Sequence, residues 1–208
     1  MGLFGSSTPA KPPPTLESLG RPIGVIPTFT KHQQQMALKV RERKMSFSSD
    51  DYSIKDAGTG QKVFEVDGKA FSLHSKKVLN DAYGQPVFML KKALMSLHTS
   101  YDGIDANGQT LFNIKSKFGF GANLKVTFRN LAGAGEEMEL HIKGDWFDRK
   151  ASITTAQGIP VAHISRSFMN AGQLLWDQQT YFVTIAPGVD AALMVAACIC
   201  LDESENDK

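Results

Sequence analysis

A turn signature that occurs five times constrains the fold of this chain more than any other feature. The clear copies begin at Gly60, Gly84 and Gly108, and weaker copies begin at Gly135 and Gly158. The lead glycines recur about every 24 residues, and such a fixed period indicates an internally repeated unit. In the first three copies an Asp-Ala pair precedes the glycine, at residues 56–57, 81–82 and 105–106. Asp and Gly supply the side-chain turn and the positive φ of a tight reversal, so each copy predicts strand, turn, strand.

The segment from 187 to about 203 predicts a helix that is apolar on every side. Asp190 is the only charged residue between positions 186 and 201, and Pro187 and Asp190 suit the start of a helix. A helix without a polar stripe is either buried in protein or spans a membrane. The uninterrupted apolar run covers only 11 residues, from Ala191 to Leu201, whereas a bilayer needs about 20. The sequence therefore predicts a helix buried inside the protein.

Five hairpins with flanking strands give roughly ten to twelve strands. A barrel of about this size encloses a central helix, and closure removes the exposed edges of a long meander. The fold class predicted is mainly β: a closed antiparallel barrel of about twelve strands around the hydrophobic C-terminal helix. A β-solenoid or a propeller is the alternative, but neither provides a place for a wholly apolar terminal helix.

Composition divides the chain into three parts. Residues 1–35 are rich in proline and poor in large apolar side chains, which predicts a flexible leader. Residues 36–204 form the predicted barrel domain, and residues 205–208 form an acidic tail. The net charge of +2 is too small to favour bulk nucleic-acid binding, and no nucleic-acid contact is expected from the barrel. The start lacks an apolar core of signal-peptide length, so a cytoplasmic protein is expected.

The sequence offers no pattern for catalysis, a cofactor or a metal. The five histidines are scattered singly, without the spacing of a zinc site. Ser96 and His98 share a strand face without an evident acid partner. Cys198 and Cys200 are two apart on the predicted helix and cannot face each other, so we expect two small buried hydrophobes. We therefore expect no catalytic residues, no metal ligands and no cofactor.

Basic residues occur close to several predicted turns. Two pairs of lysines are adjacent in the sequence, Lys76 with Lys77 and Lys91 with Lys92. They form either a solvated barrel exterior or a face for anionic lipid headgroups, where each Lys near an anionic surface adds about 1 kcal/mol. The first six residues also fit the motif for N-myristoylation at Gly2, although an ordinary chain start is the alternative. One acyl chain gives only marginal membrane affinity, so a basic surface would be needed as a second signal.

Three ordered stretches resemble the LURP-one-related family, which lies within the Tubby C-terminal-like superfamily. They are residues 78–87 with Lys92 and 96–98, residues 142–149, and residues 187–190 continuing through 201–203. The resemblance covers about residues 36–204 and leaves the proline-rich leader outside. It implies a twelve-stranded barrel around a hydrophobic C-terminal helix, in agreement with the argument from the turns.

For function, the resemblance implies a non-enzymatic module related to the phosphoinositide-tethered Tubby regulators and to the phospholipid scramblases. Tubby proteins hold the headgroup with basic residues on the strands after their first hairpin, and the corresponding positions here are Lys69, Lys91 and Lys92. Phe71 and Leu73 stand where the Tubby pattern is more basic. The expected partners are anionic phospholipid headgroups or a protein, with the protein peripheral at a membrane or in the nucleus. The alternative is a regulatory scaffold without lipid affinity.

Overall fold

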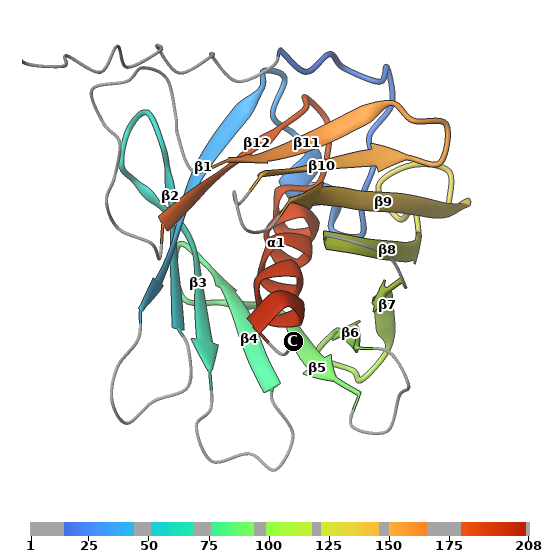
Figure 1. The fold of residues 1–208 in the computed structure, drawn as a ribbon. Coiled ribbons are helices and arrows are strands. Elements are labelled where there is room, and N and C mark those ends of the chain that lie inside the picture. Colours follow the sequence, from blue (N-terminus) through green and yellow to red (C-terminus); the bar gives the residue numbers. More distant parts are fainter. Residues whose placement is uncertain are drawn as a thin grey trace, which may run out of the picture.

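The computed structural model describes residues 15–43, 51–68, 76–93, 99–117, 122–145, 150–165 and 180–206. Its strands follow one another around a single closed barrel, in the order β1-β12-β11-β10-β9-β8-β7-β6-β5-β4-β3-β2 (Figure 1). The elements are η1 (Pro27–Thr30), β1 (Met36–Arg43), β2 (Asp51–Asp56), β3 (Lys62–Gly68), β4 (Lys76–Asp81), β5 (Pro86–Lys92), β6 (Ser100–Ile104), β7 (Thr110–Ser116), β8 (Ala122–Arg129), β9 (Glu137–Asp145), β10 (Lys150–Thr155), β11 (Pro160–Ser165), β12 (Thr180–Ile185) and α1 (Ala191–Asn206).

The barrel closes between its first and last strands. Strand β1 pairs antiparallel with β12, from Met36 opposite Ile185 to Arg41 opposite Thr180, and it pairs with β2 on its other side. Helix α1 runs through the lumen (Figure 1), and every residue from Ala191 to Leu201 is at most 2% exposed. The predicted antiparallel barrel around a central hydrophobic helix is confirmed. Both cysteines of α1 are free and buried, as expected.

The five predicted turns have the predicted backbone. Their lead glycines all adopt positive φ, between 73° at Gly60 and 83° at Gly158. In the first turn, Asp56 Oδ1 accepts hydrogen bonds from the amides of Gly58 and Thr59. Asp81 and Asp105 accept equivalent bonds in the second and third turns. The left-handed glycine therefore occurs in all five hairpins and the Asp side-chain turn in the first three, and all five turns lie at the end of the barrel where α1 begins.

The helix starts later and ends later than the sequence predicts. Gly188 has a φ of 78°, so the chain makes a turn before the helix. Asp190 then caps α1, because its Oδ1 accepts hydrogen bonds from the amides of Ala192 and Leu193. The predicted start at 187 is therefore wrong by one turn. The helix continues to Asn206, so residues 205 and 206 belong to it and not to a separate acidic tail.

The prediction of a flexible leader over residues 1–35 is wrong for residues 15–35. Leu16, Ile23 and Val25 are at most 4% exposed and belong to the core of the barrel. The amide of Ile23 donates to the carbonyl of Gly188 at 3.0 Å, and the carbonyl of Ile23 accepts from the amide of Asp190 at 2.8 Å. This segment covers the end of the barrel that carries the hairpin turns. Its apolar side chains are buried there although they follow no helical period in the sequence. Residues 1–14 lie outside the described part.

Candidate binding surfaces

The lysines predicted to bind lipid are only partly within the described structure. Gly2 and Lys69 lie outside the described residues. Lys91 and Lys92 are the last two residues of β5, and they point to opposite sides of the sheet, as the alternation of a strand requires. Lys92 follows the buried Leu90 on the inward side and lies opposite Tyr101 of β6. Lys91 faces outward, opposite Lys76 on one side and Asp102 on the other.

Three pairs of lysines lie directly opposite each other on the outer face of the barrel. Side chains at such positions are neighbours, and like charges there are destabilising. The pairs are Lys39 with Lys55, Lys76 with Lys91, and Lys115 with Lys125. The sequence shows the lysines, but it does not show which of them are opposed, because that depends on the strand register.

Carboxylates offset some of this positive charge. Lys125 Nζ lies 3.0 Å from Glu139 Oε2, and this contact lowers the pKa of Glu139 below its ordinary value. Lys62 Nζ lies 3.1 Å from Glu65 Oε2. Lys115, Lys117 and Lys143 are exposed. Within the part of the chain that the structure describes, none of these three side chains has a hydrogen bond or ion pair.

A buried charged cluster lies inside the barrel where α1 ends. Lys77 points inward, is 6% exposed, and places its Nζ 2.5 Å from Glu203 Oε1. The same ammonium lies 5.1 Å from the centre of the Tyr52 ring, and the Tyr52 hydroxyl donates to Asp202 Oδ2 at 3.0 Å. Burial raises the pKa of Tyr52 far above its ordinary value, and the carboxylates of Asp202 and Glu203 raise it further. The cluster compensates the acidic last turn of α1, where the helix dipole disfavours carboxylates.

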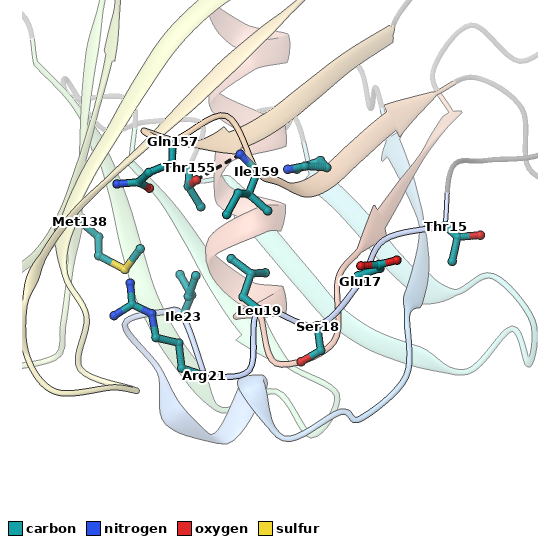
Figure 2. A pocket seen from close by; sticks show the side chains of 11 residues that line it. Thr15, Glu17, Ser18, Leu19, Arg21, Ile23, Met138, Thr155, Gln157 and Ile159 are labelled. Atoms are coloured by element: carbon teal, nitrogen blue, oxygen red, sulfur yellow. Dashed lines mark hydrogen bonds between the residues drawn. The ribbon is translucent and has the colours of Figure 1, made fainter.

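A pocket of about 390 Å³ lies at the opposite end of the barrel, between residues 15–23 and the β10–β11 turn. Figure 2 shows Leu19, Ile23 and Met138 beneath the turn that carries Ile159, whose amide donates to Thr155 Oγ1 at 3.3 Å. Sequence reasoning misses this pocket, because about half of its lining comes from the segment predicted to be a flexible leader. Its lining residues are Thr15, Glu17, Ser18, Leu19, Arg21, Ile23, Met138, Thr155, Gln157, Ile159 and Pro160.

The described residues contain no arrangement that fits a metal site or a catalytic triad. No group of three or more His, Cys, Asp or Glu side chains in the described ranges is placed to hold a metal ion. Ser152 Oγ lies 3.1 Å from His163 Nδ1 on the outer face, and burial lowers the pKa of that imidazole. No described carboxylate orients His163, so the pair lacks the third member of a catalytic triad.

No helix in the described ranges is long and apolar enough to cross a membrane.

Comparison with known proteins settles the family. The family model described as LURP-one-related matches residues 36–202, which is most of the chain and the whole barrel up to Asp202. The chain belongs to the LURP-one-related family. The family resemblance of its turn and helix segments is thereby confirmed. A crystal structure of an Arabidopsis thaliana protein matches this LURP-one-related protein with a TM-score of 0.60 and 21% identity, covering 87% of this chain and 97% of that chain. At this identity the match shows a shared fold. No curated protein matches.

Proposed function

We propose that this LURP-one-related protein is a non-enzymatic module that docks on anionic phospholipid surfaces through lysines on the outside of its barrel. The observation that supports this proposal is the three directly opposed lysine pairs on the outer face. Opposed like charges destabilise a sheet, and a layer of phosphates would offset that repulsion. Lys91, predicted from the resemblance, belongs to one of these pairs, and Lys69 lies outside the described residues.

The expected affinity follows from the number of lysines that reach the surface. Each contributes about 1 kcal/mol close to an anionic leaflet, and the effect fades beyond a Debye length of about 8 Å at physiological ionic strength. Three or four lysines therefore give weak, reversible and salt-sensitive docking. Acylation of Gly2 would add a second membrane signal, because one acyl chain and a basic face together suffice where either alone is marginal. The protein would then be peripheral at a membrane, with a cytoplasmic or nuclear pool.

A second candidate function is a regulatory scaffold that binds a protein partner and no lipid. The pocket between residues 15–23 and the β10–β11 turn favours it, because its apolar floor could receive a partner's side chain. Ile159 at its rim is 49% exposed, which is unusual for a large apolar residue of the barrel. The two functions place the contact on different surfaces, the outer face of the strands for lipid and the turn end of the barrel for a protein partner.

Vesicle co-sedimentation of the full chain separates the two functions. We expect binding to phosphatidylcholine vesicles that contain phosphatidylserine or a phosphoinositide, no binding to phosphatidylcholine alone, and release at high salt. A protein that stays in the supernatant with every anionic vesicle at low salt would refute the lipid function. The scaffold function would then take its place.

A further inference from the structure

Resting on the proposed lipid function, we infer that the docking face is the outer surface of β7, β8 and β9, and not the β4–β5 face that contains Lys91. This face, called here the β7–β9 patch, consists of Lys115, Lys117, Lys125 and Lys143. Its ligand is a continuous anionic phospholipid surface.

The strand register brings these four lysines together. Lys115 of β7 lies opposite Lys125 of β8, which lies opposite His141 of β9. In the next row, the amide of Lys117 donates to the carbonyl of Asn123, and Asn123 lies opposite Lys143. Neighbouring strands are about 4.8 Å apart and rows about 7 Å apart, so the patch spans roughly 10 Å by 7 Å. At this spacing the positive potentials of the lysines add in physiological salt.

The patch is more exposed than the β4–β5 face, and three of its four lysines make no ion pair within the described residues. Lys115, Lys117 and Lys143 are exposed, whereas Lys76 and Lys91 are half-buried. Lys91 also lies opposite Asp102. Two acids do lie near the patch: Glu139 contacts Lys125, and Asp145 lies opposite Lys150 at the end of β9. The three exposed lysines remain available to a ligand.

The barrel prevents one flat membrane from using both faces. Twelve strands closed into a ring turn the outward direction by about 30° per strand, so the β4–β5 pair and the centre of the patch point about 100° apart. The Lys39 and Lys55 pair on β1 and β2 points almost directly away from the patch. Figure 1 shows β1 and β2 on one side of α1 and β7, β8 and β9 on the other.

The residues of the patch favour a ligand with many phosphate groups in one plane. The exposed large apolar residues of the described chain are Tyr83, Leu131 and Ile159, and all three lie in turns at the other end of the barrel. Among the described residues, the patch therefore offers no aromatic platform for nucleic-acid bases and no apolar anchor for a protein hot spot. Lysines act as point charges and do not impose the fixed geometry of an arginine fork. Such a surface matches many phosphates in a plane.

Three double variants of the full chain test this assignment, each with two lysines replaced by glutamine and therefore with equal net charge. They are Lys115→Gln with Lys143→Gln on the patch, Lys76→Gln with Lys91→Gln on β4–β5, and Lys39→Gln with Lys55→Gln on the far side. The readout is the partition coefficient on phosphatidylcholine vesicles with and without phosphatidylserine. We expect the patch variant to bind about 30-fold more weakly, since each lysine contributes about fivefold. The other two should change by less than about threefold.

Each outcome decides a different statement. If the wild type ignores phosphatidylserine vesicles, the proposed function fails. If it binds, but the β4–β5 variant carries the loss or all three variants weaken equally, the function stands and the β7–β9 patch is overturned. Inorganic phosphate is compared with sodium chloride at equal ionic strength. A larger displacement by phosphate would show a single-phosphate site and overturn the assignment to a lipid surface. Unchanged melting temperatures of all three variants exclude a folding defect.

Discussion

Asp190 joins two separate parts of the chain at one carboxylate, and its replacement by alanine should destabilise the protein severely. Its Oδ1 caps α1 through the amides of Ala192 and Leu193, at 2.9 and 3.2 Å. Its Oδ2 accepts from the amides of Val25 and Ile26, at 3.0 and 2.7 Å. The residue itself is 0% exposed. Four amides would therefore lose their acceptor in Asp190→Ala.

The loss of unfolding free energy in Asp190→Ala can be worked out from these four contacts. Loss of a helix cap costs about 1 kcal/mol, and each buried amide left without an acceptor costs about 1–3 kcal/mol. Removal of a buried carboxylate returns part of this cost, because its desolvation no longer opposes folding. We expect Asp190→Ala to lower the free energy of unfolding by about 3–5 kcal/mol near neutral pH, measured by urea denaturation. The control is Asp56→Ala, whose turn contacts are exposed to water, and it should cost about 1 kcal/mol.

The pH dependence of this cost has a definite sign. Burial raises the pKa of Asp190 from its ordinary 3.8 to about 6, although the four amides oppose the shift. The folded state therefore holds the proton more tightly than the unfolded state. The resulting stability is fully present below pH 3.8 and is lost as the pH rises through about 6. The cost of Asp190→Ala should consequently fall by up to about 3 kcal/mol over that interval.

Asp56 should show the opposite sign. Its contacts with Thr59 lower its pKa, so its contribution is present above its ordinary pKa and is lost on acidification. If the cost of Asp190→Ala instead grew with pH, the amides would outweigh burial in setting the charge of Asp190. A cost of less than about 1 kcal/mol would refute the carboxylate's role in joining the leader to the helix.

Four further predictions concern the interior of the barrel, its central helix and the leader. Val195→Asp places an unpaired carboxylate in the barrel and should lower the free energy of unfolding by at least about 4 kcal/mol, measured by urea denaturation. Truncation before Pro187 should leave no soluble folded protein, because the barrel loses its central helix. A monomeric truncated chain with a cooperative melt would contradict the second prediction. Removal of residues 1–14 should leave the melting temperature unchanged. Removal of residues 1–34 should lower it by about 10 °C or more, in line with at least about 4 kcal/mol, because it removes the buried Leu16, Ile23 and Val25 and leaves Asp190 Oδ2 without its amides. Equal melting temperatures would mean that the leader adds no stability. Lys77→Ala should cost about 3 kcal/mol because it removes the ammonium that pairs with the largely buried Glu203, and Lys77→Met with Glu203→Gln should recover most of that loss. Additive costs would show that the two residues are not coupled.

Local chemistry explains why most of the fold could be predicted. Three features can be recognised from the sequence alone: the glycine turns, the period between them and the all-apolar helix. Turn conformation and burial depend on residue type at fixed spacing, so these features predict the hairpins and the buried helix. The start of the helix was less predictable. Pro187 is compatible with a first turn of helix, and only the contacts of Gly188 and Asp190 with residues 23–26 show that the chain turns there first.

The leader and the inward lysine depend on tertiary contacts. Leu16, Ile23 and Val25 follow no period, so their burial at the barrel end had no signal beyond their apolar character. Alternation indicates that one member of Lys76 and Lys77 points inward, but its pairing with Glu203 joins residues more than a hundred positions apart. The neighbour that weakens Lys91 as a lipid contact, Asp102, likewise depends on the β5–β6 register.

The last prediction concerns the independence of the two ends of the barrel. Strand β9 runs from Glu137, beside the turn end with its pocket, to Asp145, beyond Lys143 of the β7–β9 patch. Six residues of strand separate Glu137 from Lys143, which is about 20 Å and more than twice the Debye length. A charge placed at the pocket should therefore leave docking unchanged. We expect Ile159→Asp to bind phosphatidylserine vesicles as the wild type does, while Lys143→Asp weakens binding at least tenfold, or about 1.4 kcal/mol.

If Ile159→Asp abolished vesicle binding in a folded protein, the turn end would be the membrane contact. If it abolished only the capture of a protein partner, the barrel would be able to hold lipid and partner at the same time.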